Sequence, residues 1–587
     1  MTEPKPKNEW HRFRAYLCLG GLCAGFALLA AQLYSIQVRD HERYVTLARR
    51  QQLTSEVIPA RRGTIYDCKL HKLALTREVK SCFLSPRDVE DPAEAASVLA
   101  RLLGVDAAAL RQKVESERDR QFLWVKRQLS DEEAARVEAV TLRGVHLQVE
   151  QERVYPVGQL ASHVVGFTDI DGHGREGVEA RYDALLAGKP GRRALYRDGR
   201  RRCRAVGTLS DEPAQNGYDL VLTIDVALQG IVEEELDRIM RDWKPAGATI
   251  IVLDVPTGEV LALGNRPTFD ANEPGRVPAE CRFDRAVGFS FEPGSVFKPF
   301  VFSGALGAGT VDLEDEIFCH EGYYKPRQGQ GLRDHKAFGW LTARDVVVQS
   351  SNIGMALIGE SMGMPLLYRT VRNFNFGDRT GIELPGEVSG KVFPLPSWRP
   401  VSLTRIPMGH EVSVTPIQLA TAMNALANDG VLVLPRVVRA VVDWEHGLAQ
   451  QPERKDGRRV MPSALAQTMV KDVLANVVRK GTGQRAGLTT YEVAGKTGTA
   501  QKLVDGVYSH TRFVSSFACV APVEKPRITV LVVVDAPTTG PSYYGGTVAA
   551  PSAARVVEES LFYLQVPPQP LRVAEGTQRG SAQEMGW

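Results

Sequence analysis

Three short motifs, spread over residues 295–499, constrain this chain more than any other feature of its sequence. They are Ser295-Val-Phe-Lys298, Ser350-Ser-Asn352 and Lys496-Thr-Gly-Thr499. The patterns Ser-x-x-Lys, Ser-x-Asn and Lys-Thr-Gly each occur once in the chain, in that order. A single Ser-x-x-Lys is weak evidence, because serine and lysine are frequent and often share a solvated helix face. Three ordered motifs at domain-scale spacing indicate one shared site.

Ser295 is the predicted nucleophile of that site. A neutral serine hydroxyl attacks poorly and needs a base within hydrogen-bond reach. Pro293 and Gly294 interrupt the chain just before it, and the apolar run 296–306 predicts a buried helix whose first turn carries the serine. Because residues three apart on a helix share a face, Lys298 is expected beside the Ser295 hydroxyl.

Lys298 is the predicted general base. An exposed lysine is protonated, but burial, a helix N-terminus and the second cation Lys496 all disfavour the charged form and should lower the pKa of Lys298. Ser350 can relay a proton to a leaving amine, and Asn352 can orient Lys298 or a substrate amide. The predicted catalytic residues are therefore Ser295, Lys298, Ser350, Asn352 and Lys496.

The third motif predicts an edge strand that binds substrate through Thr497, Gly498 and Thr499. A glycine in such a strand lets a substrate backbone approach closely. An oxyanion needs two preorganised hydrogen-bond donors. The backbone N–H groups of Ser295 and Thr499 are the candidates for this role.

An uncharged segment, Ala15–Ile36, is long enough to cross a bilayer as a helix and has no cleavage site of the A-x-A kind, so it predicts an uncleaved signal-anchor. Basic residues flank it on both sides, so the charge rule does not decide its orientation. The tail 1–14 cannot hold a domain, and residues 37–587 are therefore expected to be the functional side, outside the cytoplasmic membrane. Gly21 and Gly25 form a G-x-x-x-G that could pack against another helix, although small residues are frequent in spans without any partner.

Composition excludes several classes of function. The chain is 43% hydrophobic and 24% charged, with a net charge of +3, and no basic run interleaved with aromatics points to nucleic acid. The eight cysteines and eleven histidines show no metal-ligand spacing, so we expect no metal and no other cofactor. Cys68 and Cys82 are the best candidates for a disulfide, with free thiols the more probable state.

The length of 587 residues suggests two or more domains. Residues 37–215 are rich in charge and lack the three motifs. Strands are predicted there at 57–66 and 73–84, and short amphipathic helices at 91–103, 106–114 and 130–139. These patterns indicate an α+β region.

The pattern of the sequence changes at residue 217. Residues 216–564 are expected to form the catalytic domain. A strand at 219–224 and a helix at 226–239 open it. Five further strands are predicted at 249–254, 259–263, 493–502, 513–521 and 528–535, followed by a helix at 549–563. Strands from both ends enclose a largely helical segment, about 285–480, which predicts a sheet flanked by helices. The Pro-rich, polar residues 565–587 are expected to be disordered.

The three motifs resemble the active site of the penicilloyl-serine transferases. The N-terminal anchor and several further segments resemble the class B penicillin-binding proteins. These segments are Arg62-Gly63-x-Ile65-x-Asp67, Glu176-Gly177-x-Glu179, Asp254-x-x-x-Gly258, Thr415-Pro-x-Gln418 and Tyr544-Gly-Gly546. Without a recognisable C-terminal repeat module, the chain is most similar to the division-specific septal (FtsI-type) transpeptidases.

The resemblance implies a multidomain α+β fold: one transmembrane helix, an elongated α+β pedestal of the dimerisation type at 37–215, and a transpeptidase domain with a five-stranded antiparallel sheet. It implies D,D-transpeptidation, in which Ser295 attacks the D-Ala-D-Ala bond of a peptidoglycan stem peptide and a neighbouring strand's amine resolves the acyl-enzyme. It also implies inhibition by β-lactams, a single-pass protein of the cytoplasmic membrane at the division septum, and divisome partners that include a glycan polymerase of the shape, elongation, division and sporulation (SEDS) family.

Two segments depart from the family pattern. Cys68-Lys69-Leu70 stands where the family usually has Arg-Asn-Gly, so that hairpin must turn differently. Gly409-His410-Glu411 stands where the family often has Gly-x-Gly, which affects the rim of the cleft. A near match to the glutamate motif of glycan polymerases, at 314–322, lies inside the predicted transpeptidase domain and is interpreted as a coincidence.

Other functions stay open on the sequence alone. Elongation- or sporulation-specific wall synthesis is the nearest alternative to the septal role. A β-lactamase would share the motifs but not the anchor and pedestal, and a β-lactam sensor would carry several spans. A divisome scaffold with a silent site is disfavoured, because every motif residue is intact.

Overall fold

The computed structural model describes residues 8–197, 203–205, 212–326, 329–452, 457–504, 507–540 and 542–568. The chain divides into two compact units, residues 1–61 with 188–217 and residues 62–187 with 218–587. The expected disorder of the C-terminal tail concerns mainly residues 569–587, which lie outside the described residues. The predicted domain limits at 215 and 564 stay a prediction.

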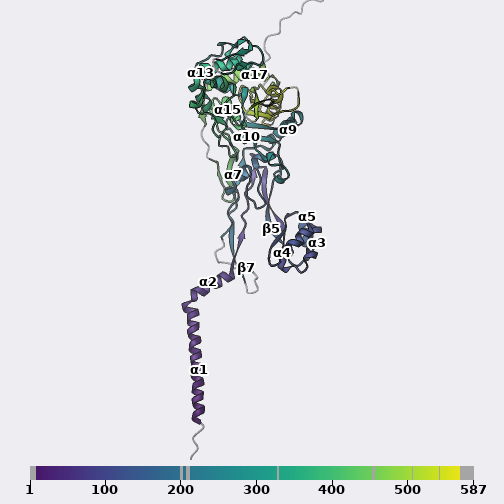
Figure 1. The fold of residues 1–587 in the computed structure, drawn as a ribbon, viewed down its shortest axis with the longest axis vertical. Helices are drawn as coiled ribbons and strands as arrows, with labels where there is room; N and C mark the ends of the chain where they lie inside the picture. The colour runs from purple at the N-terminus through teal and green to yellow at the C-terminus, as the bar shows by residue number, and fades with distance from the viewer. Residues whose placement is uncertain are drawn as a thin grey trace, which may run out of the picture. The chain divides into compact units, whose positions relative to one another are not determined.

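The first unit contains α1 (Asn8–Tyr34), the longest helix of the described chain (Figure 1). A π-helical turn, Ser35–Arg39, and helix α2, His41–Gln52, follow it. The segment Glu9–Arg39 is long enough to cross a membrane, and an 18-residue window of it has a mean hydropathy of 1.8. The predicted span 15–36 lies within this segment.

The first unit also holds a three-stranded antiparallel sheet in the order β1-β6-β7. Its strands are β1 (Leu53–Ile58), β6 (Gly191–Arg197) and β7 (Cys203–Ala205). The single strand expected at 57–66 is wrong: β1 ends at Ile58, and a separate strand, β2 (Ile65–Tyr66), begins after a gap. Pro59, which lacks an N–H for a sheet ladder, and Gly63 lie in that gap.

In the second unit, seven strands form a sheet in the order β19-β18-β8-β2-β3-β4, with β5 also pairing β3. Besides β2, its strands are β3 (Lys72–Leu84), β4 (Leu123–Leu129), β5 (Val145–Val154), β8 (Asp219–Leu222), β18 (Val438–Asp443) and β19 (Leu448–Gln450). The strands expected at 73–84 and 219–224 are confirmed. Because β8 and β18 pair with strands from the N-terminal half, one sheet joins segments that are far apart in the sequence.

Three short helices pack against β3, β4 and β5, and Figure 1 shows them gathered together. They are α3 (Pro92–Leu103), α4 (Ala107–Ser116) and α5 (Asp131–Glu138), and they confirm the three predicted helices. Asp91, Asp106 and Ser130 each cap a helix by accepting hydrogen bonds from backbone N–H groups of its first turn.

The hairpin between β2 and β3 turns without a glycine, as its unusual sequence required. Leu70 adopts the left-handed conformation with φ of 68°, and the Asp67 carboxylate accepts hydrogen bonds from the backbone N–H groups of Lys69 and His71, both at 2.8 Å. The Asp67 side chain therefore stabilises a turn that elsewhere needs glycine. Cys68 and Cys82 are both free thiols.

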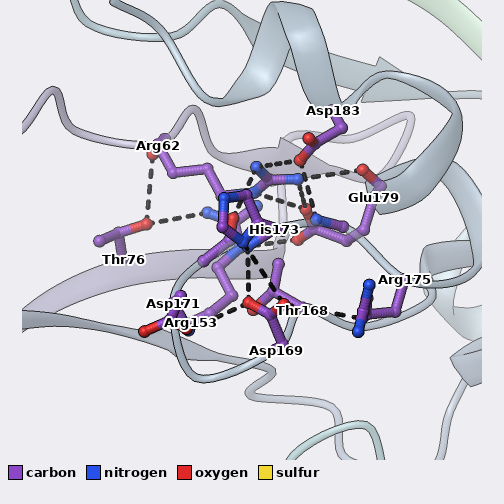
Figure 2. A network of polar contacts seen from close by, with 12 residues as sticks. Arg62, Thr76, Arg153, Thr168, Asp169, Asp171, His173, Arg175, Glu179 and Asp183 are labelled. Atoms are coloured by element: carbon purple, nitrogen blue, oxygen red, sulfur yellow. Dashed lines mark hydrogen bonds and ion pairs between the residues drawn. The ribbon is translucent and has the colours of Figure 1, made fainter. Parts of the chain in front are cut away.

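Two of the motifs that resemble class B proteins meet in one buried ion pair (Figure 2). Arg62 Nε donates to Glu179 Oε2 at 2.7 Å, and Arg153 Nε donates to Glu179 Oε1 at 2.7 Å. Arg62 also reaches Asp183 Oδ1 at 2.7 Å. Glu179 lies in α7 (Gly177–Arg181) and is fully buried. Loss of either partner would leave a buried charge unpaired, which is strongly destabilising.

A second sheet of this unit has five antiparallel strands in the order β10-β9-β23-β22-β21, as predicted. Its strands are β9 (Gly247–Asp254), β10 (Val260–Arg266), β21 (Ala494–Val504), β22 (Val507–Ala521) and β23 (Ile528–Asp535). Both faces are covered, so β9 and β23 are buried along their whole length. Helices α9 (Val226–Trp243) and α19 (Ala550–Tyr563) pack on one face of the sheet. Helix α15 (Pro416–Ala427) belongs to the hydrophobic core on the other face and contacts the sheet there.

The segment between β10 and β21 is largely helical, as expected. Besides α15, its main helices are α11 (Lys298–Gly307), α12 (Ala343–Val348), α13 (Asn352–Asn373), α16 (Ser463–Thr468) and α17 (Ala475–Arg479). The polymerase-like segment 314–322 contributes the short strand β11 (Glu316–Phe318) to this part of the unit.

Candidate active site

The nucleophile candidate Ser295 lies in a single 3₁₀ turn, Gly294–Phe297, which leads directly into α11. Sequence analysis expected it in the first turn of an α helix; instead, Lys298 is the first residue of α11. Gly294 explains the difference, because its φ of 58° belongs to the left-handed region and a Cβ there would lie 2.8 Å from Thr499 O. The turn thus holds Ser295 against the third motif.

A second glycine supports the same turn from the other side. Gly409 O accepts a hydrogen bond from Gly294 N at 3.2 Å. Gly409 has a φ of 81°, and a Cβ on it would lie only 2.2 Å from Gly294 O. The chain therefore needs glycine at both positions to seat Ser295.

Lys298 is fully buried, and its amine contacts the second motif. Nζ lies 2.6 Å from Ser350 O, 2.9 Å from Asn352 Oδ1 and 3.2 Å from Ser350 Oγ. Burial lowers the pKa of Lys298 to about 7, and the charge of Asp334 opposes this shift. Within the described residues these contacts do not include Ser295 Oγ; catalytic hydrogen bonds are often long in unliganded sites.

The pattern of these contacts fits a neutral amine. A neutral amine has two N–H donors and one lone pair, and the two oxygens that can only accept, on the Ser350 carbonyl and the Asn352 amide, use both donors. The lone pair is then free to accept a hydroxyl proton, from Ser350 or from an approaching Ser295.

Ser350 joins the two buried lysines. Its φ of 60° is the left-handed conformation that non-glycine residues rarely adopt, and such strain is concentrated at functional sites. Lys496 Nζ donates to Ser350 Oγ at 3.0 Å, opposite Lys298. Burial, and then the nearby Lys298, lower the pKa of Lys496. Of the three causes that the sequence predicted for the lowered pKa of Lys298, burial is the one found.

Asp334 is a site residue that sequence analysis missed. Its carboxylate accepts hydrogen bonds from Ser351 Oγ at 2.7 Å and Ile353 N at 3.2 Å, and also from Asn352 N, at the start of α13. It therefore fixes the helix terminus that carries the second motif. Asp334 follows the short strand β13 (Leu332–Arg333), and no local pattern distinguished it from other acidic residues.

The third motif lies on β21, the edge strand of the five-stranded sheet. Thr497 Oγ1 lies 2.8 Å from Thr482 Oγ1, and Gly545 N donates to Thr499 Oγ1 at 3.0 Å. A Cβ on Gly498 would lie 2.3 Å from Ser516 Oγ and 3.0 Å from Pro293 O. This glycine therefore makes room for Ser516 and Pro293 of the protein itself, and the predicted approach of a substrate stays a prediction.

These residues surround a cavity of about 570 Å³. Members of all three motifs line it: Ser295, Ser350, Asn352, Thr497 and Thr499. The rings of Phe513 and Tyr543, 3.7 Å apart and nearly parallel, form part of its wall. Sequence analysis also did not anticipate Arg333, His335, Thr482 and Arg485 in this lining.

The part of the chain that the structure describes contains no group of three His, Cys, Asp or Glu residues that could hold a metal ion. The chemistry available in the cavity is that of the Ser295 hydroxyl and of the Ser350 hydroxyl, which contacts two buried amines whose pKa values are lowered. Such a site can accept and return protons during acyl transfer to a serine.

Comparison with known proteins agrees with the fold. The penicillin-binding protein transpeptidase domain matches residues 248–558, and the penicillin-binding protein dimerisation domain matches residues 57–222. The chain is 34% identical to the probable peptidoglycan D,D-transpeptidase PenA of Neisseria gonorrhoeae, over 94% of this chain and 92% of that protein. It is 29% identical to the peptidoglycan D,D-transpeptidase FtsI of Escherichia coli, over 98% of this chain and 96% of that protein.

Among solved structures, penicillin-binding protein 3 of Mycobacterium tuberculosis in complex with aztreonam is similar, with a TM-score of 0.68 and 28% identity over 88% of this chain and 98% of that one. Two features together define a penicillin-binding serine transpeptidase: Ser295 in a turn beside the edge strand of a five-stranded sheet, and Ser350 bonded to two buried lysines in the same site. The chain belongs to the penicillin-binding protein transpeptidase family, and its two matched domains give it the class B arrangement. Its apolar N-terminal helix fits a single-pass protein of the inner membrane.

Proposed function

We propose that this protein is a peptidoglycan D,D-transpeptidase that cross-links stem peptides through an acyl-enzyme on Ser295. The observation that carries the proposal is the buried amine of Lys298, whose lowered pKa of about 7 makes a neutral base available beside Ser350 and Asn352, which line the cavity together with Ser295. β-Lactams would acylate the same serine and act as inhibitors. No cofactor takes part in the proposed reaction.

In acylation, the Lys298 amine accepts the Ser295 hydroxyl proton while Oγ attacks the carbonyl carbon of the penultimate D-alanine. The backbone N–H groups of Ser295 and Thr499 are the proposed donors to the oxyanion. Ser350, which bonds to both lysines, passes a proton to the leaving D-alanine nitrogen as the C–N bond breaks. Asn352 holds Lys298 in place, and Lys496 supports the Ser350 hydroxyl.

Substrate binding is assigned to the edge of β21. Thr497 and Thr499 line the cavity, while Gly498 keeps the strand close to the Ser295 turn. An edge strand presents unpaired backbone groups that an extended peptide can pair with. A stem peptide that added to this edge would place its scissile bond near Ser295.

A cell-division role is the favoured setting. The similarity to FtsI over nearly the whole chain supports septal wall synthesis, and elongation- or sporulation-specific synthesis is the alternative. In this proposal the tail 1–14 is cytoplasmic, 15–36 spans the membrane, and the pedestal 37–215 and the transpeptidase domain 216–564 lie outside. Reporter fusions after Trp587 test the orientation, since activity from a reporter that works only in the cytoplasm would contradict it.

The proposed partners are a SEDS-family glycan polymerase and other divisome membrane proteins. A cross-linking enzyme needs nascent strands nearby, and tethering raises their effective concentration. The transpeptidase and dimerisation matches account for residues 57–222 and 248–558 and include no polymerase domain. A separate protein must therefore supply the strands.

The experiment that tests the proposed activity uses the purified full chain with a pentapeptide donor strand and an acceptor strand. Cross-linked dimer and released D-alanine should form together, and Ser295→Ala should abolish both. Rapid turnover of nitrocefin without cross-linked product would instead support a β-lactamase, and unchanged cross-linking by the Ser295→Ala variant would overturn the assignment of the nucleophile.

A further inference from the structure

His410 lines the active-site cavity, and its imidazole contacts the carboxylate of Glu292. His410 Nδ1 lies 2.9 Å from Glu292 Oε2. His410 lines the 570 Å³ cavity together with Ser295, whereas Glu292 lines a neighbouring cavity of about 400 Å³. Glu292 therefore holds the Nδ1 side of an imidazole whose residue lines the same cavity as Ser295.

The Glu292 carboxylate is itself fixed. Tyr508 OH lies 3.0 Å from both of its oxygens, and the backbone N–H of Glu411 donates to Oε1 at 3.1 Å. Burial, and then the charge of Glu292, raise the pKa of the Tyr508 phenol, which keeps it a donor. The side chain of Glu292 is 16% exposed and that of His410 is 30% exposed.

The backbone fixes both members of this pair relative to Ser295. Phe291 and Val414 exchange backbone hydrogen bonds at 3.1 Å and 2.9 Å, so the segments that carry Glu292 and His410 run side by side. Gly409 O accepts from Gly294 N, one residue before the nucleophile. These hydrogen bonds are between backbone groups and do not involve the His410 side chain, so replacing that side chain leaves the Ser295 turn in place.

These contacts also fix the tautomer. An ionised carboxylate only accepts hydrogen bonds, so Nδ1 carries the proton and Nε2 presents its lone pair to the cavity. A proton taken up at Nε2 would be stabilised by the adjacent Glu292 charge. This is the arrangement of a base oriented by a carboxylate.

The proposed transpeptidation needs such a base. The acceptor arrives as an ammonium ion, R–NH₃⁺, and must lose two protons to form the new amide. One proton moves, through Lys298, to the Ser295 oxygen as the C–O bond of the acyl-enzyme breaks. The second proton is in excess and needs another acceptor, because Lys298 can hold only one.

We propose that His410 Nε2 accepts this excess proton. The acceptor ammonium, bound on the His410 side of the cavity, gives one proton to Nε2, and the resulting amine attacks the acyl carbon. The C–N bond forms, the C–O bond to Ser295 breaks, and imidazolium, paired with Glu292, releases its proton to water. Glu292 is a positioning residue, and this inference rests on the proposed function.

Other titratable groups in the cavity are less suited to this step. The Asp334 carboxylate is occupied by donors from the start of α13. His335 also lines the cavity, but burial, and then the charge of Lys298, lower its pKa, which disfavours its protonated form. His410 alone of these three combines a free lone pair with a carboxylate partner among the described residues.

The test separates the two half-reactions in the full-length protein. Acylation by a β-lactam and by a D-alanyl thioester donor is measured first, and His410→Gln should leave both rates unchanged. Two acceptors are then compared: D-alanine, an ammonium at neutral pH, and aminooxyacetate, whose amine is already a free base there. His410→Gln should reduce amide formation with D-alanine on the order of 10²-fold, while amide formation with aminooxyacetate is retained.

Glu292→Gln should produce the same selective loss in weaker form, because the amide still orients the imidazole but cannot balance its charge. His446→Gln is the matched control, since His446 Nδ1 also pairs with a carboxylate, Asp443, at 2.7 Å, away from the cavity. An equal loss with both acceptors would show a structural role, and no loss with D-alanine would remove His410 from the step. A selective loss in His335→Gln but not in His410→Gln would also overturn the proposal. If the wild-type chain is not acylated at all, the proposed function itself fails.

Discussion

At the scale of single residues, Lys298 is unusual because it is a buried lysine whose polar contacts are all to uncharged groups. It is completely buried, yet all three of its polar contacts are to uncharged groups, on Ser350 and Asn352. A buried lysine without a directly paired carboxylate favours its neutral form. The neutral form of Lys298, which lets it act as a base, therefore depends on its burial in the fold and not on the order of the motifs alone.

Lys298→Arg should abolish acylation rather than weaken it. Arginine keeps the positive charge but cannot be deprotonated in a protein, and removal of a positioned base costs roughly 10²–10⁴-fold in rate. Lys471→Arg, an exposed lysine paired with Glu524, is the control and should acylate normally. Stopped-flow acylation by a β-lactam measures both. A wild-type rate in Lys298→Arg would show that Lys298 is not the base.

The pKa of Lys298 also predicts a pH dependence with a definite sign. Burial lowers the pKa to about 7, so above that pH the amine is neutral and the acylation rate should be constant. As the pH falls below about 7, the amine takes up a proton and the rate should fall by about tenfold per pH unit. An acylation rate that stays level down to pH 5 would contradict the neutral-base mechanism.

At the scale of elements, the site depends on how closely three segments approach one another. Gly294 touches Thr499, and Gly409 touches Gly294, in each case where a Cβ would collide with backbone. Close backbone contacts therefore join three elements: the 3₁₀ turn, the segment before α15 and strand β21. Ser295 is positioned by this contact as much as by its own helix.

Gly409→Ala should therefore reduce acylation at least tenfold, because its Cβ would lie 2.2 Å from Gly294 O and push the Ser295 turn away. Gly381→Ala is a matched control: its φ of 80° nearly equals the 81° of Gly409, but nothing lies within 4 Å of the added Cβ. Both variants should lose about 1–2 kcal/mol from the left-handed backbone, which thermal unfolding measures. If the two acylate equally, the contact with Gly294 does not position Ser295.

The sequence predicted the elements well and the contacts between them poorly. The five-stranded sheet and the three short helices follow from hydrophobic periodicity and capping residues, which are local. Asp334 and Glu292 could not be placed, because their importance comes from contacts across 18 and 118 residues of chain. His410 was expected at the rim of the cleft, but its partner Glu292 was not. Gly498 has close neighbours within the protein, Ser516 on β22 and Pro293 O, and the approach of a substrate to this glycine stays a prediction.

At the scale of the whole molecule, the proposed role joins a membrane helix to an acyl-transfer site. An anchor needs only hydrophobicity, whereas a helix that docks onto a polymerase needs small residues on one face. Gly21 and Gly25 are one turn apart on α1. A Cβ added to either glycine would meet no other part of the described chain within 4 Å. This face of α1 is where a partner helix is proposed to pack.

Gly21→Leu with Gly25→Leu should reduce co-purification with the SEDS-family polymerase and septal wall synthesis, while penicillin binding survives. Cys23→Leu with Ala27→Leu is the control, because these residues face the opposite side of the helix and remain apolar. If replacement of the whole span by an unrelated one leaves both activities intact, the contact must run through the pedestal. Polymerisation of lipid-linked disaccharide by the purified chain alone would contradict the need for a partner.

The most direct test of the central claim is the mass of the acyl-enzyme. The full-length protein is incubated with a β-lactam, its intact mass is measured, and the modified peptide is sequenced. The account predicts a single adduct per chain on Ser295, absent from a Ser295→Ala variant that melts at the wild-type temperature. An adduct that persists in Ser295→Ala, or that maps to another serine of the wild-type chain, would contradict it.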